Sequence, residues 1–374
     1  MDKSKRACRL LFKSILAAIA LSHCGCKELL VKMPKELEKT GVEIGNGLFD
    51  KKVFLSDRGI GKVTDLYIRN KKAGDTLEII VAGINGVRFV DRHASIKSKI
   101  VFDKSATHVD VIDLGEGRPF EYLNRGGEGW QDSSLIDHSG KTLWTYGGDP
   151  GVDDMAAGDL DGDGKPEFVV GFNGDGGVHL VNHDGKKQWA ISGSNEWSVE
   201  IADTDGDGAK EIIKIGSASV MIWGKDGKLM RKNKLELPNI TGIFSLCYWP
   251  NDAGQKSILT TSYYPDTHVC IFGFDGKLLA KLDAPKCEAY SARRLWGTPV
   301  KLRDNEPEYF AVIADFGILD RASLYVFDPE RKLVYQEILP ESCQSIAAVS
   351  LGDPNKESIL VGGYGKILRY DLLR

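Results

Sequence analysis

Two nine-residue segments of this sequence repeat one pattern of acidic side chains and glycines. Residues 159–167 read DLDGDGKPE, and residues 203–211 read DTDGDGAKE. The side-chain oxygens at positions 1, 3, 5 and 9 of such a loop can converge on one point, because the glycines let the backbone wrap without Cβ clashes. Ca²⁺ takes about six to eight oxygen ligands, and the backbone carbonyl of Lys165 or Ala209 would supply one more at position 7. The pattern therefore predicts two calcium sites.

The residues that follow each segment exclude the EF-hand type of calcium loop. An EF-hand loop has a bidentate glutamate at its twelfth position and is followed by a helix. Here the twelfth position is Val170 in one segment and Lys214 in the other, and β-rich sequence follows both. We therefore expect the two loops to lead into β-strands.

The acidic segments lie inside a larger repeat. A hairpin signal of glycine followed by lysine recurs at Gly140, Gly185, Gly227 and Gly276, a spacing of about 45 residues that is typical of propeller blades. Reading outward from these anchors gives seven units, which cover about residues 62–102, 109–146, the two stretches that contain the acidic segments, 243–282, 297–338 and 345–374.

The last unit contains only three predicted strands. The segment KVFL at residues 52–55, which precedes the first unit, is a natural fourth strand for it. Pairing these two parts of the chain would close the ring and remove the exposed strand edges of an open sheet. We therefore predict an all-β fold over residues 48–374: a single β-propeller of seven four-stranded blades, closed by an N-terminal strand.

The first 47 residues are typical of a targeting and linking segment. Basic residues precede the apolar run 15–21, which is too short to span a membrane and fits a signal-peptide core. The run ends in Leu21-Ser22-His23-Cys24, which resembles a bacterial lipobox with a lipidated cysteine. We expect a signal peptide over 1–23, a lipid anchor on Cys24, a tether over 24–47, and a location in the cell envelope, at the outer membrane or cell surface. Simple secretion, a periplasmic location and an uncleaved anchor are the alternatives.

Four cysteines lie within the predicted propeller, and export would permit disulfides there. Cys287 and Cys343 occupy matching positions in the connectors that enter the sixth and seventh units, so they are candidates for a disulfide between neighbouring blades. Cys247 and Cys270 fall in strands and are expected to be buried thiols. No Cys-x-x-Cys pair occurs in the sequence, so zinc and redox chemistry have no support.

Residues 156–171, AAGDLDGDGKPEFVVG, resemble the FG-GAP/VCBS-type repeat of integrin-α-like propellers, and the resemblance extends over about residues 152–228. In that family the loop between the first and second strands of a blade binds Ca²⁺. The resemblance implies two sets of side-chain ligands: Asp159, Asp161, Asp163 and Glu167, then Asp203, Asp205, Asp207 and Glu211. The segments GKTLW at 140–144 and GKKQW at 185–189 also resemble the quinoprotein-type propeller repeat.

Charge and motifs argue against several classes of function. A net charge of −4 offers no electrostatic case for nucleic-acid binding. The sequence lacks the Gly-x-Ser-x-Gly, His-Glu-x-x-His and phosphate-loop motifs, and its seven histidines are dispersed. His108, on a connector that enters a blade, is the histidine best placed for chemistry. The sequence thus favours a protein without catalytic activity.

The topology of a propeller separates the calcium loops from the expected ligand surface. Loops between the first and second strands lie on one face, whereas connectors that enter the blades and turns between the second and third strands lie on the other. The candidate ligand-binding residues on this second face are Asp154, Glu196, Trp197, Arg293 and Arg294. Three other tryptophans, Trp144, Trp189 and Trp223, fall within strands and are expected in the core.

These observations favour a monomeric, non-catalytic, envelope-tethered propeller that is stabilised by two structural calcium ions and binds a protein or glycan partner. One alternative is a calcium-dependent polysaccharide-processing enzyme of the lyase type, for which His108, Arg293 and Arg294 are the candidate bases. Another is a scaffold in outer-membrane assembly, suggested by the quinoprotein-like tryptophans.

Overall fold

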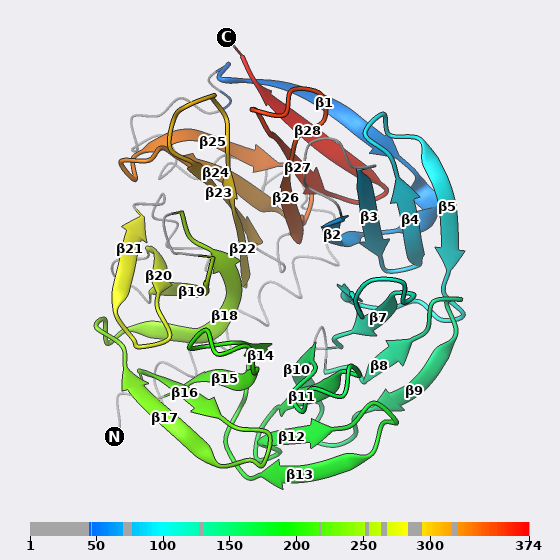
Figure 1. The fold of residues 1–374 in the computed structure, drawn as a ribbon, viewed down its shortest axis with the longest axis vertical. Coiled ribbons are helices and arrows are strands. Elements are labelled where there is room, and N and C mark those ends of the chain that lie inside the picture. The colour runs from blue at the N-terminus through cyan, green and yellow to red at the C-terminus, as the bar shows by residue number, and fades with distance from the viewer. Residues whose placement is uncertain are drawn as a thin grey trace, which may run out of the picture.

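The computed structural model describes residue 45 and residues 47–69, 77–126, 130–216, 218–250, 254–262, 268–282, 294–315 and 320–373. These residues form seven four-stranded antiparallel sheets arranged around a central axis (Figure 1). The chain is therefore a seven-bladed β-propeller, which confirms the prediction from the repeat spacing. The described residues include one short 3-10 helix, η2 (Arg58–Ile60), and none of their helices has the length and hydropathy to cross a membrane.

The first six blades each consist of four consecutive strands, from the innermost to the outermost. Blade 1 contains β2 (Val63–Arg69), β3 (Glu78–Gly83), β4 (Gly86–Val90) and β5 (Ile96–Val101), and blade 2 contains β6 (Val109–Ile112), β7 (Glu121–Asn124), β8 (Ser133–Ile136) and β9 (Thr142–Tyr146). Blade 3 contains β10 (Val152–Gly158), β11 (Glu167–Phe172), β12 (Val178–Val181) and β13 (Lys187–Ile191), and blade 4 contains β14 (Val199–Ala202), β15 (Glu211–Gly216), β16 (Ser219–Trp223) and β17 (Leu229–Lys234). Blade 5 contains β18 (Ile240–Tyr248), β19 (Lys256–Ser262), β20 (Val269–Phe272) and β21 (Leu278–Leu282), and blade 6 contains β22 (Arg294–Val300), β23 (Tyr309–Asp315), β24 (Ala322–Phe327) and β25 (Leu333–Leu339).

Blade 7 joins the two ends of the described chain. It consists of β26 (Ser345–Val349), β27 (Ser358–Gly362), β28 (Lys366–Leu372) and, as its outermost strand, β1 (Phe49–Ser56). Strand β1 pairs antiparallel with β28, with Phe49 opposite Leu372 (blue beside red in Figure 1). The predicted closing strand is confirmed. It extends beyond residues 52–55 because Phe49 is also buried, with its ring 4.9 Å from that of Tyr335 in blade 6.

The apolar core is divided among the junctions between blades. The described residues form seven hydrophobic clusters, each of which combines side chains of two neighbouring blades. In β11, Phe168 and Val170 pack towards blade 2, whereas Val169 between them packs towards blade 4. Successive side chains of a strand point to opposite faces, and a neighbouring blade covers each face. The middle strands are therefore apolar at nearly every position.

Two of the recurring hairpin glycines lie where the preceding blade approaches. Gly185 has a φ of +78°, and a Cβ on it would lie 2.8 Å from Cγ of Trp144 in blade 2. The indole of Trp144 donates a hydrogen bond to the carbonyl of His183, at 2.8 Å. Trp189 and Gly227 repeat this contact one blade further on. Trp144 and Trp189 therefore pack between blades and are half-buried.

The predicted starts of the fifth and sixth units fall about three residues late. Strand β18 starts at Ile240 and has a bulge before Phe244, and β22 starts at Arg294 although Gly297 and Pro299 lie within it. Glycine and proline resemble turn signals in the sequence. The innermost strand has an unpaired edge towards the axis, where proline removes no ladder hydrogen bond.

Hydrogen bonds between innermost strands fix neighbouring blades relative to one another. Thr64 Oγ1 of blade 1 accepts from the N–H of Val109 in blade 2 (2.9 Å) and donates to its carbonyl (3.0 Å). Ser245 Oγ of blade 5 donates to the Leu295 carbonyl of blade 6, at 2.6 Å. The polar side chains on these strands therefore hold fixed positions around the axis.

Candidate functional site

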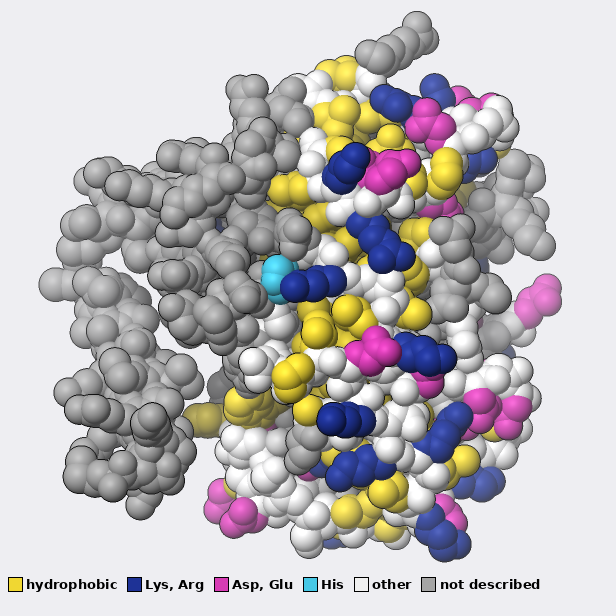
Figure 2. Space-filling model, turned by 90° about the vertical axis from the view of Figure 1, so that its left-hand side faces the viewer, with side chains coloured by type: hydrophobic (Ala, Val, Ile, Leu, Met, Phe, Trp, Pro, Cys, Tyr) yellow, Lys and Arg dark blue, Asp and Glu magenta, His cyan; other side chains and the backbone are white. Residues whose placement is uncertain are grey.

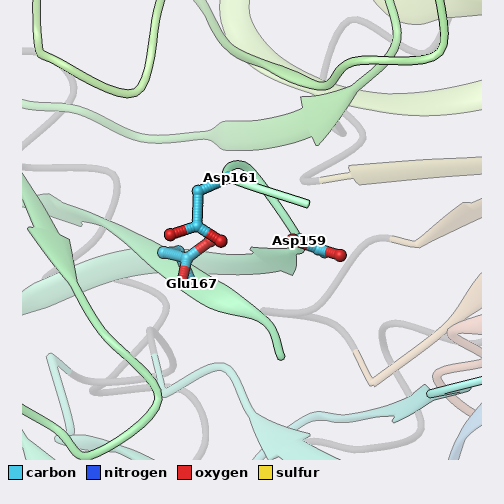
Figure 3. Close-up of side chains that lie close together, drawn as sticks. All are labelled: Asp159, Asp161 and Glu167. Atoms are coloured by element: carbon cyan, nitrogen blue, oxygen red, sulfur yellow. The ribbon is translucent and has the colours of Figure 1, made fainter. Parts of the chain in front are cut away.

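The acidic loop of blade 3 connects β10 to β11. Carboxylate oxygens of Asp159, Asp161 and Glu167 lie within 4.8 Å of one another, and Figure 3 shows Asp161 of the loop beside Glu167 at the start of β11. The two carboxylate oxygens of Asp159 accept hydrogen bonds from the N–H groups of Gly162 (2.7 Å) and Gly164 (2.9 Å). Both glycines have a positive φ, +80° and +83°, which favours glycine because a Cβ would strain the backbone.

The loop of blade 4, between β14 and β15, has the same local structure. Oxygens of Asp203, Asp205 and Glu211 lie within 4.8 Å of one another. Gly206 and Gly208 have φ values of +82° and +90°, and their N–H groups donate to Asp203 at 2.6 and 2.9 Å. The repeated spacing of acids and glycines thus produces the same geometry twice.

Three of the four predicted carboxylates in each loop come together. The fourth, Asp163 or Asp207, instead accepts a hydrogen bond from the backbone N–H two residues later, at 2.7 Å for Asp163 and 2.8 Å for Asp207. Burial, together with repulsion from Asp161 and its acidic neighbours, raises the pKa of Glu167 above its ordinary value. Crowded carboxylate oxygens are the hard donors that Ca²⁺ prefers, so the residues present fit a calcium ion.

Asp154 and Arg294, two of the candidate ligand residues, lie at the centre of the ring. They do not lie on the exposed face of the connectors that enter the blades. Asp154, on β10, is 2% exposed. Arg125, after β7, donates to both of its carboxylate oxygens (2.9 and 3.0 Å), and Arg294 of blade 6 contacts the same carboxylate. Burial raises the pKa of Asp154, but the two guanidinium charges outweigh that effect and hold the pKa below its ordinary value. Both residues therefore belong to a buried ion-pair network.

Sequence reasoning missed two further members of this network, Asp110 and Glu200. Arg125 also donates to Asp110 of blade 2 (2.8 Å) and to Glu200 of blade 4 (3.0 Å). The available signal was a charged residue within an otherwise apolar innermost strand. Together with Tyr67 and Lys210, these side chains line a polar hollow of about 580 Å³.

The remaining candidate ligand residues differ in their exposure. Glu196 is only 4% exposed and forms an ion pair with Lys214 of β15. Its burial raises the pKa of Glu196 although Lys214 opposes the shift. Trp197, in contrast, is 44% exposed. Arg293 lies outside the described residues, so its role stays a prediction.

His108 is held by internal contacts. Its Nε2 lies 3.2 Å from Asp110 Oδ1, its Nδ1 lies 3.2 Å from Gln344 Oε1, and its ring stacks on Trp296 at a centroid distance of 5.9 Å. The side chain is also buried. Both ring nitrogens therefore face partners within the protein and not an open groove.

One face of the disc carries exposed aromatic side chains. We call it the connector face, because the connectors that enter the blades lie there with the turns between second and third strands. Trp130, in the β7–β8 turn, is 60% exposed, and Tyr364, in the β27–β28 turn, is 58% exposed. Trp197, in the β13–β14 connector, lies on the same face. Trp130 and Tyr364 each line a hollow, of about 460 and 440 Å³ respectively.

One side of the rim of the disc has a mixed surface. On the side shown in Figure 2, lysine and arginine side chains are interspersed with acidic and apolar ones. This arrangement agrees with the small net charge of −4. It differs from the continuous basic stripe that nucleic-acid-binding proteins present.

The family model of the FG-GAP-like repeat matches residues 159–213, which include both acidic loops. Together with the ring of seven blades, this match supports an FG-GAP-type repeat β-propeller. It agrees with the resemblance that the sequence showed over about residues 152–228.

Solved structures share the propeller fold at low sequence identity. BBS1N, crystallised in complex with ARL6DN, is 12% identical with a TM-score of 0.52, and the match covers 87% of this chain and 97% of that one. Virginiamycin B lyase from Staphylococcus aureus is 10% identical with a TM-score of 0.53, and the match covers 87% of this chain and all of that one (100%). No curated protein matched the sequence. These likenesses show the fold alone.

The predicted modifications involve residues outside the described ranges. Cys24 and the signal peptide precede residue 45, so lipidation stays a prediction. Cys343 is buried, but Cys287 is not described, so their disulfide also stays a prediction. Cys247 and Cys270 are buried, as expected for strand residues.

Proposed function

We propose that this protein is a non-catalytic, calcium-stabilised propeller that binds a protein partner through its connector face. The observation that carries the proposal is the exposure of Trp130, Trp197 and Tyr364 on that face, while the charged groups at the ring centre are paired internally. Exposed aromatic side chains are enriched where proteins bind one another. A glycan is the alternative ligand.

The positions of the aromatic side chains favour a protein over a glycan. Trp130 belongs to blade 2, Trp197 precedes blade 4, and Tyr364 belongs to blade 7. These groups are distributed around the ring, and a broad partner surface contacts them together more readily than a narrow sugar chain does. The propeller of BBS1N, a structure with the same fold, was crystallised in a complex with another protein.

Calcium is proposed as a structural component. The acidic loops lie between the first and second strands of their blades, at the end opposite the connector face. An ion there would neutralise three crowded carboxylates in a loop and order the turn before β11 or β15. It would therefore support binding indirectly, through the stability of blades 3 and 4.

The lyase alternative has less support from the geometry. His108 and Arg294, two of its candidate bases, are engaged with Asp110 and Asp154. The similarity to virginiamycin B lyase concerns the fold and carries no residue roles. A location in the cell envelope, with Cys24 as lipid anchor, is proposed from the sequence alone, as is the alternative of an outer-membrane assembly scaffold.

The experiment that tests the proposal is affinity capture from solubilised cell envelope and from a glycan panel, with calcium and with chelator. The bait is the protein without its predicted signal peptide, beside a Trp130→Ala/Trp197→Ala variant and a Leu143→Ala control. Leu143 is 46% exposed but lies on the outermost strand β9, away from the connector face. A protein retained by the wild type and the control, and lost from the tryptophan variant, supports the proposal. Equal retention by all three baits, or retention and shortening of a polysaccharide, contradicts it.

A further inference from the structure

The two acidic loops differ at two positions beside them. The second position of the loop is Leu160 in blade 3 and Thr204 in blade 4. On the outermost strands, Trp189 of β13 pairs with Leu180, and Arg231 of β17 occupies the corresponding place in blade 4. The blade 3 loop thus has an apolar pair beside it, Leu160 and Trp189, where the blade 4 loop has the polar pair Thr204 and Arg231.

In blade 3 the acidic group lies beside Leu160 and Trp189, although Lys165, Lys225 and His183 line the same hollow. Leu160 and Trp189 belong to the same hydrophobic cluster, and both line a hollow of about 450 Å³ together with Asp161 and Glu167. Within the described part of the chain, none of the three clustered carboxylates of this loop forms an ion pair with a basic side chain. No guanidinium group of the described residues thus pairs with these carboxylates in the way that Arg231 pairs with those of blade 4.

In blade 4 a guanidinium group lies against the acidic group. Arg231 Nη2 lies 3.1 Å from Asp205 Oδ2 and 3.9 Å from Glu211 Oε2. The same nitrogen donates to Thr204 Oγ1, and this hydroxyl donates to Glu211 Oε2 at 2.6 Å. Arg231 thus contacts two of the three clustered carboxylates, which a calcium ion would also require as ligands.

We infer that Arg231 is a built-in cation of the blade 4 loop, so that the two loops bind calcium unequally. An arginine side chain keeps its charge at every physiological pH, so it neutralises this loop permanently. A calcium ion in blade 4 must displace the guanidinium from Asp205 and Glu211. In blade 3 the guanidinium of Arg118 contacts the loop at the Gly164 carbonyl and forms no ion pair with the clustered carboxylates. The blade 3 loop takes calcium first, and the blade 4 loop keeps its fold without it. This inference rests on the proposed calcium binding and assigns it mainly to one site.

The test is isothermal titration of Ca²⁺ into the chelator-treated protein. The wild type is expected to show one tight site and a second site at least about tenfold weaker, because affinity follows the number of free charged ligands. Asp161→Asn should remove the tight site, and the matched Asp205→Asn should leave it intact. Arg231→Met should strengthen the second site at least about tenfold, whereas Arg231→Lys, which keeps the charge, should leave it weak.

A double substitution that copies the side chains of blade 3 into blade 4 provides an independent test. Thr204→Leu/Arg231→Trp installs the side chains of the tight site around the second loop and should produce two sites of similar affinity. Folding is checked by circular dichroism, and in chelator Arg231→Met should melt below the wild type and recover when calcium is added.

The possible results separate the inference from the proposed function. Two equal sites in the wild type that Arg231→Met does not change would overturn the inference and leave calcium stabilisation standing. Absence of calcium binding from the wild type and from every variant would overturn both.

Discussion

Arg294 of blade 6 and Asp154 of blade 3 meet at the centre of the ring, with Nη1 of the arginine 3.3 Å from Oδ1 of the aspartate. They lie 140 residues apart in the chain and on blades that are not neighbours. Arg125 of blade 2 binds the same carboxylate, so Asp154 connects three blades at once. The centre of the propeller is therefore held together by charge as well as by strand packing.

Substitution of Asp154 should be strongly destabilising. Asp154→Asn leaves two buried guanidinium groups without their shared anion, which we expect to cost about 3–5 kcal/mol of unfolding free energy. Arg294→Met should cost less, about 1.5–3 kcal/mol, because Arg125 still pairs with the carboxylate. Urea unfolding measures both, with the exposed Asp304→Asn as control. A loss for Asp154→Asn no larger than that of the control would contradict the buried network.

Asp65 on β2 should make stability depend on pH. Burial, and then the negative charge of Asp110, raise the pKa of Asp65 to about 7 from an ordinary value of 3.8, while His108 lowers it to a smaller extent. The folded protein therefore binds the extra proton. The contribution of Asp65 to stability is complete below about pH 4 and is lost as the pH rises through 7.

Asp65→Asn tests this pH dependence because asparagine can still accept the hydrogen bond from the N–H of Val111, which is 2.9 Å from the carboxylate. We expect the variant to be more stable than the wild type by about 1–2 kcal/mol at pH 8, with the difference shrinking towards pH 4. Urea unfolding between these pH values measures it. A difference that does not change with pH would contradict the raised pKa of Asp65.

Removal of β1 should open the ring. A variant without residues 48–57 exposes the edge of β28 and the core at the junction of blades 6 and 7. We expect loss of cooperative thermal unfolding and a tendency to aggregate. Phe49→Ala alone should cost about 3–5 kcal/mol, whereas Val53→Ala, at a side chain that is 57% exposed, should cost little. A cooperative, unshifted melt of the deletion variant would disprove closure by β1.

The contact between Gly185 and Trp144 should tolerate no extra carbon. Gly185→Ala places a Cβ 2.8 Å from the indole and should cost about 2–4 kcal/mol. Gly117→Ala is the matched control, since Gly117 has a similar φ of +75° and nothing within 4 Å of its virtual Cβ, so it measures the backbone strain alone. If chemical denaturation shows the same loss of unfolding free energy for both variants, the indole of Trp144 moves aside without cost.

Much of the fold was predictable because its determinants are local. The spacing of Asp159, Asp161 and Glu167 sets the loop geometry within nine residues, and the hairpin glycines mark one turn in each of four blades. The number of blades and the closing strand followed from counting strands. The strand starts at Ile240 and Arg294 were less predictable, because glycine or proline nearby suggests a turn. Only the structure shows that these residues lie on innermost strands, whose edge towards the axis is unpaired.

By itself, the amino-acid sequence determined the blades, their number and the two acidic loops, since each depends on residues that are close along the chain. Only the tertiary structure decided that Asp154 and Arg294 pair at the ring centre, because closure brings together innermost strands of blades that are distant in sequence. It also placed Arg231 against Asp205, because the outermost strand of blade 4 returns across the loop that precedes β15. Charge pairing at the ring centre depends on which side chains of distant innermost strands meet at the axis, and no local pattern encodes that.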